Sequence, residues 1–310
     1  MARSTVRREA IPQIAGIEPT DGAIGYVATG RLLEGNSSLR CTIGVRASGK
    51  ERVRRRQLTE IEDLAWCPRA VRDGGTDWLA FMANATKVFS SVAPKIRSAM
   101  AATGTDRVLD LCSGGGGPWP TLQPELAKSG PANVLLSDLY PNIEALRRAR
   151  SRTRGRLDFH GSAVDATNVP VELSGVRTMF NAFHHFPPET ARLILADAVA
   201  KRRAIAIFEG TDNRAIGLLA MPLQLPAILL LTPLVRPYRW SRLVFTYVLP
   251  LIPGIVLVDG TVSFLRLYLE DELHELVRGV PGHERFDWDI GSTRAHGIPV
   301  GLTHLIGTPR

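Results

Sequence analysis

The side chains best suited to chemistry in this sequence follow short apolar stretches. One such stretch runs into the segment Asp110-Leu-Cys-Ser-Gly-Gly-Gly-Gly117. A glycine-rich turn of this kind lets the backbone and the start of a helix approach a ligand closely. The next apolar stretch ends at Asp138, where a carboxylate can accept hydrogen bonds from both hydroxyls of a ribose. Together the two features indicate a nucleotide-like ligand.

Further polar residues follow the third and fourth apolar stretches. Asp165 comes after the third, where an acid can read an adenine amino group. His184 and His185 follow the fourth, and Glu209 and Asp212 are weaker candidates after the fifth. Because imidazole exchanges protons near neutral pH, we expect the histidines to act as a general base or a substrate anchor. Each acid alone is also typical of a turn, whereas their common order favours a ligand site.

The elements that must position these residues alternate between strands and helices. Such alternation predicts a mostly parallel sheet covered by helices on both faces, with the polar groups gathered beyond the carboxyl ends of the strands. The expected strands span 107–112, 133–137, 157–160, 178–183 and 204–208. The expected helices span 119–128, 142–154 and 188–201. An amphipathic helix is expected at 269–277, followed by antiparallel strands at 285–294 and 300–307.

With these residue groups in this order, the chain resembles the class I S-adenosylmethionine-dependent methyltransferases. The resemblance covers residues 104–212 well and 261–310 loosely. It implies a Rossmann-like α/β fold with seven strands, S-adenosylmethionine as the cofactor and methyl transfer as the activity. Cys112 stands where the glycine pattern of the family usually begins. The implied cofactor-binding residues are Asp110, Cys112, Gly114 and Gly116 for the methionine part, Asp138 for the ribose, Asp165 and the Ala166 backbone for the adenine, with Leu139 and Asn181 completing the set.

Residues 213–260, after the fifth strand, form an apolar insertion. Ile216 to Val235 and Leu243 to Val258 contain no charged residue, and the first stretch is long enough as a helix to cross a bilayer core. Prolines interrupt both stretches, which argues against straight spanning helices. We expect a lid over the substrate that contributes to a homodimer interface. The alternatives are peripheral membrane contact through 216–258 and, last, true spanning.

The remaining segments differ in charge and composition. Residues 1–56 hold 11 basic and 5 acidic residues, in a 310-residue chain whose formal net charge is +8. They are expected to form a basic, flexible extension, followed by an N-terminal helical cap at 57–103, the cofactor-binding core at 104–212 and its completion at 261–310. Three widely spaced cysteines predict neither a disulfide framework nor a metal site, and the expected location is the reducing cytoplasm.

We therefore expect methyl transfer to a hydrophobic small molecule of secondary metabolism, such as a polyketide, terpenoid, quinone or lipid-like intermediate. It would bind between the insertion and the N-terminal helices around Trp66, Trp78 and Phe81. One alternative is an RNA or DNA methyltransferase that uses the basic cluster at 52–56. A nucleic-acid partner is less expected, because such a run is usually a solvated face. The other alternative is a non-catalytic cofactor-binding or membrane-associated interaction protein.

Overall fold

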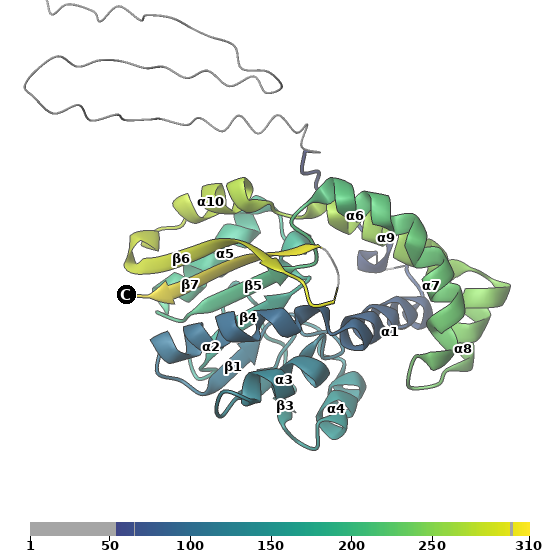
Figure 1. Ribbon diagram of the computed structural model, residues 1–310, viewed down its shortest axis with the longest axis horizontal. Coiled ribbons are helices and arrows are strands. Elements are labelled where there is room, and N and C mark those ends of the chain that lie inside the picture. The colour runs from purple at the N-terminus through teal and green to yellow at the C-terminus, as the bar shows by residue number, and fades with distance from the viewer. Residues whose placement is uncertain (1–53, 65, 298–299) are drawn as a thin grey trace, which may run out of the picture. The chain divides into compact units, whose positions relative to one another are not determined.

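The computed structural model describes residues 54–64, 66–297 and 300–310 (Figure 1). Residues 1–53 of the predicted extension lie outside the described residues. The guanidinium of Arg55 lies 3.9 Å from the centroid of the Tyr268 ring and donates hydrogen bonds to the backbone oxygens of Phe186 and Arg266. Because a cation is stabilised by an aromatic face and by backbone acceptors, this arginine packs on the fold, which differs from the predicted solvated run.

The strands form one seven-stranded sheet in the order β3-β2-β1-β4-β5-β7-β6. The first five strands are parallel, β7 pairs antiparallel with β5, and β6 pairs antiparallel with β7. This confirms the predicted mostly parallel sheet. The strands are β1 (Arg107–Asp110), β2 (Asn133–Leu136), β3 (Leu157–Phe159), β4 (Val176–Phe180), β5 (Ile205–Glu209), β6 (Phe286–Arg294) and β7 (Gly301–Pro309).

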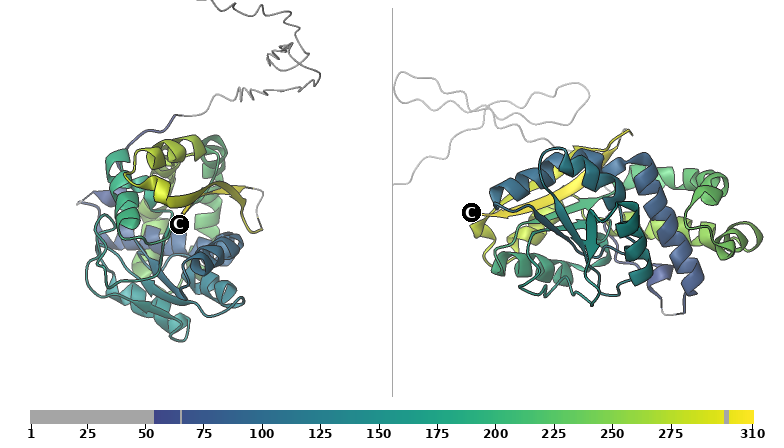
Figure 2. Two further views of the ribbon diagram at one scale, coloured as in Figure 1. Left: turned by 90° about the vertical axis from the view of Figure 1, so that its left-hand side faces the viewer. Right: turned by 90° about the horizontal axis from the view of Figure 1, so that it is seen from below.

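Helices cover both faces of the sheet, because successive residues of a buried strand point to opposite sides. In β1, Val108 belongs to the apolar cluster on one face and Leu109 to the cluster on the other. Figures 1 and 2 show the two helical layers on either side of the strands. One layer contains α2 (Ala93–Ala102), α3 (Trp119–Ala127) and α4 (Ile143–Arg152), and the other contains α5 (Pro188–Ala200) and α10 (Glu270–Arg278).

A third group of helices brings the insertion together with α1. Trp78 of α1 is buried with Ile228 of α7 and Ile252 of α9 in one apolar cluster. The predicted cap at 57–103 is therefore divided: α1 packs on the insertion, whereas α2 covers the sheet. The elements of this group are the 3-10 turn η1 (Ile61–Asp63), α1 (Arg69–Thr86), α6 (Arg214–Ala220), α7 (Gln224–Leu231), α8 (Trp240–Leu243) and α9 (Leu251–Arg266). The 3-10 turn η2 (Val88–Val92) instead packs with α2 in the apolar cluster on the sheet.

The insertion has the length and composition of a membrane-spanning segment. The helical run Arg214–Leu234 is apolar and long enough to cross a bilayer. The same holds for a second pair of helices taken together, Trp240–Val248 and Leu251–Arg266, although the chain bends by 78° between them. Short 3-10 turns at Met221–Leu223 and Thr232–Leu234 interrupt the first run at two of its prolines. This is the break that proline imposes on an α-helix.

The fourth parallel strand ends earlier than the sequence predicts. β4 spans Val176–Phe180 instead of 178–183. Asn181 has a φ of 47°, and this left-handed conformation is incompatible with extended pairing. Phe183–His185 then form the 3-10 turn η3. Both histidines therefore lie on one turn beyond the strand.

Candidate active site

The glycine-rich segment after β1 forms a tight turn with several left-handed residues. The φ angle is 57° at Cys112, 51° at Gly114 and 101° at Gly116. A left-handed conformation costs a residue with a side chain roughly 1–2 kcal/mol. A glycine at position 112 would avoid this cost, whereas Cys112 holds its backbone in a strained conformation.

Two glycines of this turn have different surroundings. A Cβ added at Gly116 would lie 2.9 Å from the Cβ of Ala149, so this glycine lets α4 pack directly against the turn. A Cβ added at Gly114 would meet no atom of the described residues within 4 Å. The turn therefore has one face closed by packing and one face open to a ligand.

Asp110, at the end of β1, is buried and points into the protein. Its carboxylate oxygens accept hydrogen bonds from Ser113 Oγ at 2.6 Å and from Thr178 Oγ1 at 2.7 Å. Burial raises the pKa of Asp110 to about 6, although the two hydroxyls oppose this shift. The side chain is placed to shape the turn and to tie it to β4. A direct contact with the methionine part of the cofactor stays a prediction.

Asp138 lies at the end of β2, beside the turn. Its Oδ2 accepts a hydrogen bond from the Gly114 N–H at 2.8 Å, and its Oδ1 accepts one from the Tyr140 N–H at 2.9 Å. Because each carboxylate oxygen has two lone pairs, acceptor capacity remains for a ribose hydroxyl. Leu139 follows on the surface and is partly exposed.

Asp165 and Ala166 lie in the loop after β3. Asp165 Oδ1 accepts hydrogen bonds from the N–H and the hydroxyl of Thr167, both at 2.8 Å, which is the geometry of a turn residue. Ala166 is buried, and the Val164 N–H donates to the Asp138 backbone oxygen at 2.9 Å. The predicted ribose and adenine residues therefore lie on adjoining loops, and their binding roles stay predictions.

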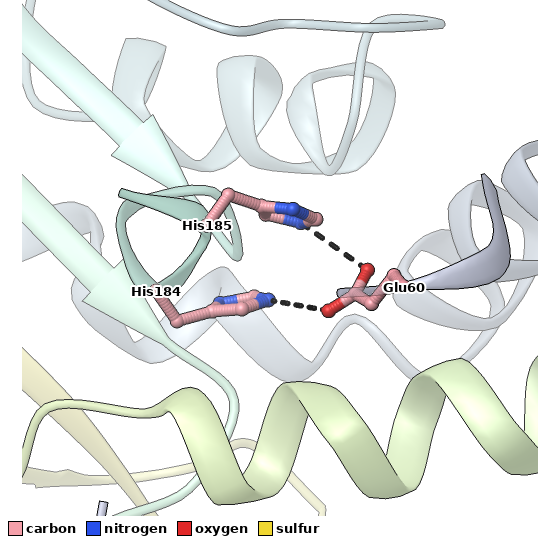
Figure 3. A group of neighbouring side chains, drawn as sticks. All are labelled: Glu60, His184 and His185. Atoms are coloured by element: carbon pink, nitrogen blue, oxygen red, sulfur yellow. Dashed lines mark ion pairs between the residues drawn. The ribbon is translucent and has the colours of Figure 1, made fainter. Parts of the chain in front are cut away.

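His184 and His185 stand side by side on η3, with Glu60 facing both rings (Figure 3). Nε2 of His184 lies 3.8 Å from Glu60 Oε1, and Nε2 of His185 lies 3.7 Å from Glu60 Oε2. Nδ1 of His184 is hydrogen-bonded to Glu209 Oε2 at 2.6 Å, and Nδ1 of His185 lies 3.6 Å from Asp63 Oδ2. Each imidazole is thus placed between two carboxylates.

Glu60 is held in place by side chains of α9. Arg266 Nη1 lies 3.2 Å from Glu60 Oε1, and the Ser263 hydroxyl donates to the same oxygen at 2.8 Å. Arg266 also donates to the backbone oxygens of His184 at 3.3 Å and of His185 at 2.7 Å. One arginine therefore fixes both the carboxylate and the turn that carries the histidines.

Sequence reasoning singled out the histidines and missed Glu60 and Arg266. Glu60 comes far earlier in the chain than the histidines, and no local pattern marks it. Of the weaker candidates, the structure brings Glu209 to His184. Asp212 instead accepts a hydrogen bond from the Ser292 hydroxyl of β6 at 2.7 Å.

Crowded carboxylates perturb the titration of this cluster. Burial raises the pKa of Glu62 to about 7, and the charges of Glu60 and Asp259 add to the shift. Contact with His185 lowers the pKa of Asp63. Burial lowers the pKa of His185, but contact with Asp63 and the charge of Glu60 outweigh it, so the net shift is upward. The surroundings of His185 therefore favour its positively charged form.

The histidines line a cavity of about 360 Å³. Asn181, His184 and Glu209 form its polar end at the carboxyl ends of β4 and β5. The apolar walls come from α1, the insertion and α9, and include Leu79, Met82, Met221, Ile255 and Phe264. The cavity therefore joins the strand ends to the apolar insertion.

This lining differs from the aromatic residues that the sequence suggested. Leu79 and Met82 of α1 line the cavity, whereas Trp78 is buried in the helical cluster and Trp66 is 69% exposed. The difference follows from the helical period, because neighbouring residues of α1 point to different faces.

Comparison with known proteins places the fold. No protein-family model matches the sequence, and no curated protein matches it. The plantazolicin methyltransferase BpumL, solved with S-adenosylhomocysteine, is similar with a TM-score of 0.50 and 12% identity, over 77% of this chain and 90% of that one. The strand order and this likeness show that the chain has the class I methyltransferase fold, as the sequence predicts.

Two further solved structures have lower TM-scores. An O-methyltransferase from neocarzinostatin biosynthesis, NcsB1, solved with S-adenosylmethionine and 2-hydroxy-5-methyl naphthoic acid, has a TM-score of 0.47 and 13% identity over 78% of this chain. Human N-acetylserotonin methyltransferase, solved with S-adenosylmethionine, has a TM-score of 0.43 and 14% identity over 77%. The chain spans 59% and 57% of these two proteins.

Proposed function

We propose that this chain is an S-adenosylmethionine-dependent methyltransferase that acts on a hydrophobic small molecule. The observation that carries the proposal is the position of the apolar cavity, whose polar end lies at the carboxyl ends of β4 and β5. In open α/β sheets ligands bind beyond these strand ends. The glycine-rich turn follows β1, which pairs with β4. The turn proposed to bind the cofactor and the cavity proposed to bind an apolar acceptor thus lie next to each other.

The residues at the strand ends fit the cofactor. The open face at Gly114 leaves room for close backbone approach, and Asp138 keeps acceptor capacity beside it. When bound, S-adenosylmethionine supplies a methyl group on a positively charged sulfur. Asp110 contributes by holding the turn through Ser113 and Thr178. In this proposal the turn Cys112–Gly116 holds the methionine part, Asp138 and Leu139 the ribose, and Asp165 and Ala166 the adenine, with Asn181 at the border of the cavity.

The cavity selects an apolar acceptor, and the histidines meet its reactive end. Burial of apolar surface stabilises a bound molecule by about 0.8 kcal/mol per CH₂ group. His184 and His185 serve as the base or the anchor for the atom that receives the methyl group. Methyl transfer depends mainly on holding that atom close and in line. The turn that Arg266 fixes is suited to such positioning.

The insertion acts as the lid of this cavity. Met221 and Gln224 in its first half and Ile255 and Val256 in its second half line the cavity wall. Its outer surface is also apolar, with Leu219 80% and Trp240 73% exposed. Exposed leucine and tryptophan are typical of segments that lie in a membrane interface.

We further propose that this outer surface rests on a membrane, from which an apolar acceptor reaches the cavity. Flotation with lipid vesicles tests this, with Leu219→Glu and Leu230→Glu expected to abolish co-flotation. Sedimentation of the wild type as a stable dimer without vesicle binding would favour the homodimer interface and contradict the membrane proposal.

Turnover tests the proposed activity. We expect the chain to release S-adenosylhomocysteine from S-adenosylmethionine when offered one of a panel of hydroxylated polyketides, terpenoids, quinones or lipids. The double variant His184→Ala with His185→Ala should lose at least about tenfold in rate while it still binds S-adenosylhomocysteine. Turnover with RNA or DNA alone would contradict the proposal. Unchanged kinetics of the double variant would show that the histidines act neither as the base nor as the anchor.

A further inference from the structure

We propose that Glu60, His184 and His185 bind one divalent transition-metal ion, and that this ion receives a hydroxyl group of the acceptor. The inference of metal binding depends only on the side-chain cluster, whereas the inference that the ion binds the acceptor hydroxyl rests on the proposed function. The sequence predicts no metal site, because the ligands come from two distant segments without a ligand-spacing motif. The fold brings these segments together at η3 (Figure 3).

The donor atoms converge on a common centre. One ring nitrogen of His184, one of His185 and a carboxylate oxygen of Glu60 all lie within 4.8 Å of one another. Neighbouring ligands of an ion with bonds of about 2.1 Å are roughly 3.4 Å apart in a tetrahedral site. The two histidine–glutamate distances of 3.8 and 3.7 Å exceed this value only slightly. Two imidazoles and one carboxylate are a donor set for Zn²⁺, Fe²⁺, Mn²⁺ or Co²⁺.

His184 provides a second, independent observation. Its side chain is 5% exposed, and among the described residues Nε2 has no hydrogen-bond partner. Because Nδ1 is bound to the Glu209 carboxylate, the proton of a neutral imidazole belongs on Nδ1 and the lone pair on Nε2. A buried acceptor without a partner costs about 1–3 kcal/mol. A cation between Nε2 and Glu60 gives this lone pair a partner.

The surrounding residues match the outer partners of metal ligands. In metal sites the second nitrogen of a ligating histidine usually meets a carboxylate, which fixes the ring orientation. Glu209 has this position for His184, and Asp63 has it for His185. Arg266 reaches Oε1 of Glu60, and Oε2 is the oxygen that faces His185. Three carboxylates thus surround the histidines, with one guanidinium beside them.

The position of the cluster indicates what the ion does. Three protein ligands leave at least one coordination position open, and the ligands line the cavity. A hydroxyl bound to a divalent cation releases its proton to water more easily. The acceptor class is therefore an apolar molecule with a hydroxyl group at one end, such as a phenol or an enol.

Metal titration of the full-length, tag-free protein tests the inference. After treatment with a chelator, we expect one Co²⁺ per chain, seen as a visible absorption band, and displacement of Co²⁺ by Zn²⁺. Glu60→Gln and His184→Gln should lower the affinity at least about 100-fold, and Glu209→Gln should lower it about 10- to 100-fold. His304→Gln is the matched control, because His304 is another buried histidine beside a carboxylate, Asp289. Thermal unfolding of each variant checks that it is folded.

Two results would overturn the inference. The first is a folded wild type that shows no stoichiometric Co²⁺ or Zn²⁺ binding, which needs no variant. The second is equal metal affinity of the wild type, Glu60→Gln and His184→Gln. A parallel titration with S-adenosylhomocysteine separates the two proposals. If the protein binds S-adenosylhomocysteine but no metal ion, only the metal site is refuted. If it binds the metal ion but no S-adenosylhomocysteine, only the proposed methyltransferase activity is refuted.

Discussion

The glycines of the turn after β1 allow a matched pair of substitutions that separates backbone strain from cofactor contact. Gly114 and Gly117 have φ angles of 51° and 47°, and a Cβ added at either meets no atom of the described residues within 4 Å. Alanine at either position should therefore lower the free energy of unfolding by the same amount, roughly 1–2 kcal/mol, from the left-handed conformation alone.

The two variants should differ in ligand affinity. In the proposed site the methionine part lies against Gly114, whose N–H donates to Asp138, so Gly114→Ala places a methyl group in the space that the cofactor needs. We expect Gly114→Ala to weaken S-adenosylhomocysteine binding at least about tenfold, which is about 1.4 kcal/mol. Gly117→Ala should bind like the wild type. Equal affinities of both variants in calorimetry, with equal losses of stability in denaturant, would refute the proposed position of the cofactor.

Three further predictions concern packing, pH and the cavity. Gly116→Ala should lower the free energy of unfolding by about 3 kcal/mol in denaturant, because strain at φ 101° adds to overlap with Ala149; a loss like that of Gly117→Ala would contradict the close contact with α4. Burial raises the pKa of Asp110 from 3.8 to about 6, so its contribution to stability is present below about pH 4 and is lost as the pH rises through about 6. The stability of Asp110→Asn relative to wild type should therefore increase by up to about 3 kcal/mol between pH 4 and pH 7, and parallel pH curves would show that Asp110 titrates normally. Ala83→Phe puts a ring into the cavity that Ala83 lines and should slow turnover at least about tenfold with S-adenosylhomocysteine affinity unchanged; an unchanged rate would show that the acceptor binds elsewhere.

Local patterns in the sequence were sufficient to predict the sheet. Val108 and Leu109 are consecutive apolar residues that pack on opposite faces, and such continuous apolar runs are typical of buried parallel strands. The end of β4 was predicted wrongly because the apolar residues Ala182 and Phe183 resemble a continuation of the strand, whereas the left-handed Asn181 ends it. Backbone conformation of this kind depends on contacts that a local pattern does not contain.

The acidic side of the candidate site was not predictable in the same way. His184 and His185 were found because they follow a strand, and that position predicts a place at the ligand-binding edge. Glu60 reaches them from the segment before η1, and Arg266 does so from the end of α9. No periodicity joins these segments, since their contact depends on the packing of α1 and α9 in the third group of helices. Tertiary contact alone assembles this part of the site.

Calorimetric titration with S-adenosylhomocysteine tests the central claim most directly, on the wild type, Asp138→Ala and the control Asp158→Ala. Asp158 is an acid of β3 that is paired with Arg150 at 3.5 Å and whose side chain is 62% exposed. We predict one binding site per wild-type chain, at least about a tenfold loss of affinity in Asp138→Ala, because a hydrogen bond to a charged group contributes about 1.5–3 kcal/mol, and no change in Asp158→Ala. A folded wild type that does not bind the nucleoside, or equal binding by Asp138→Ala, would contradict the account.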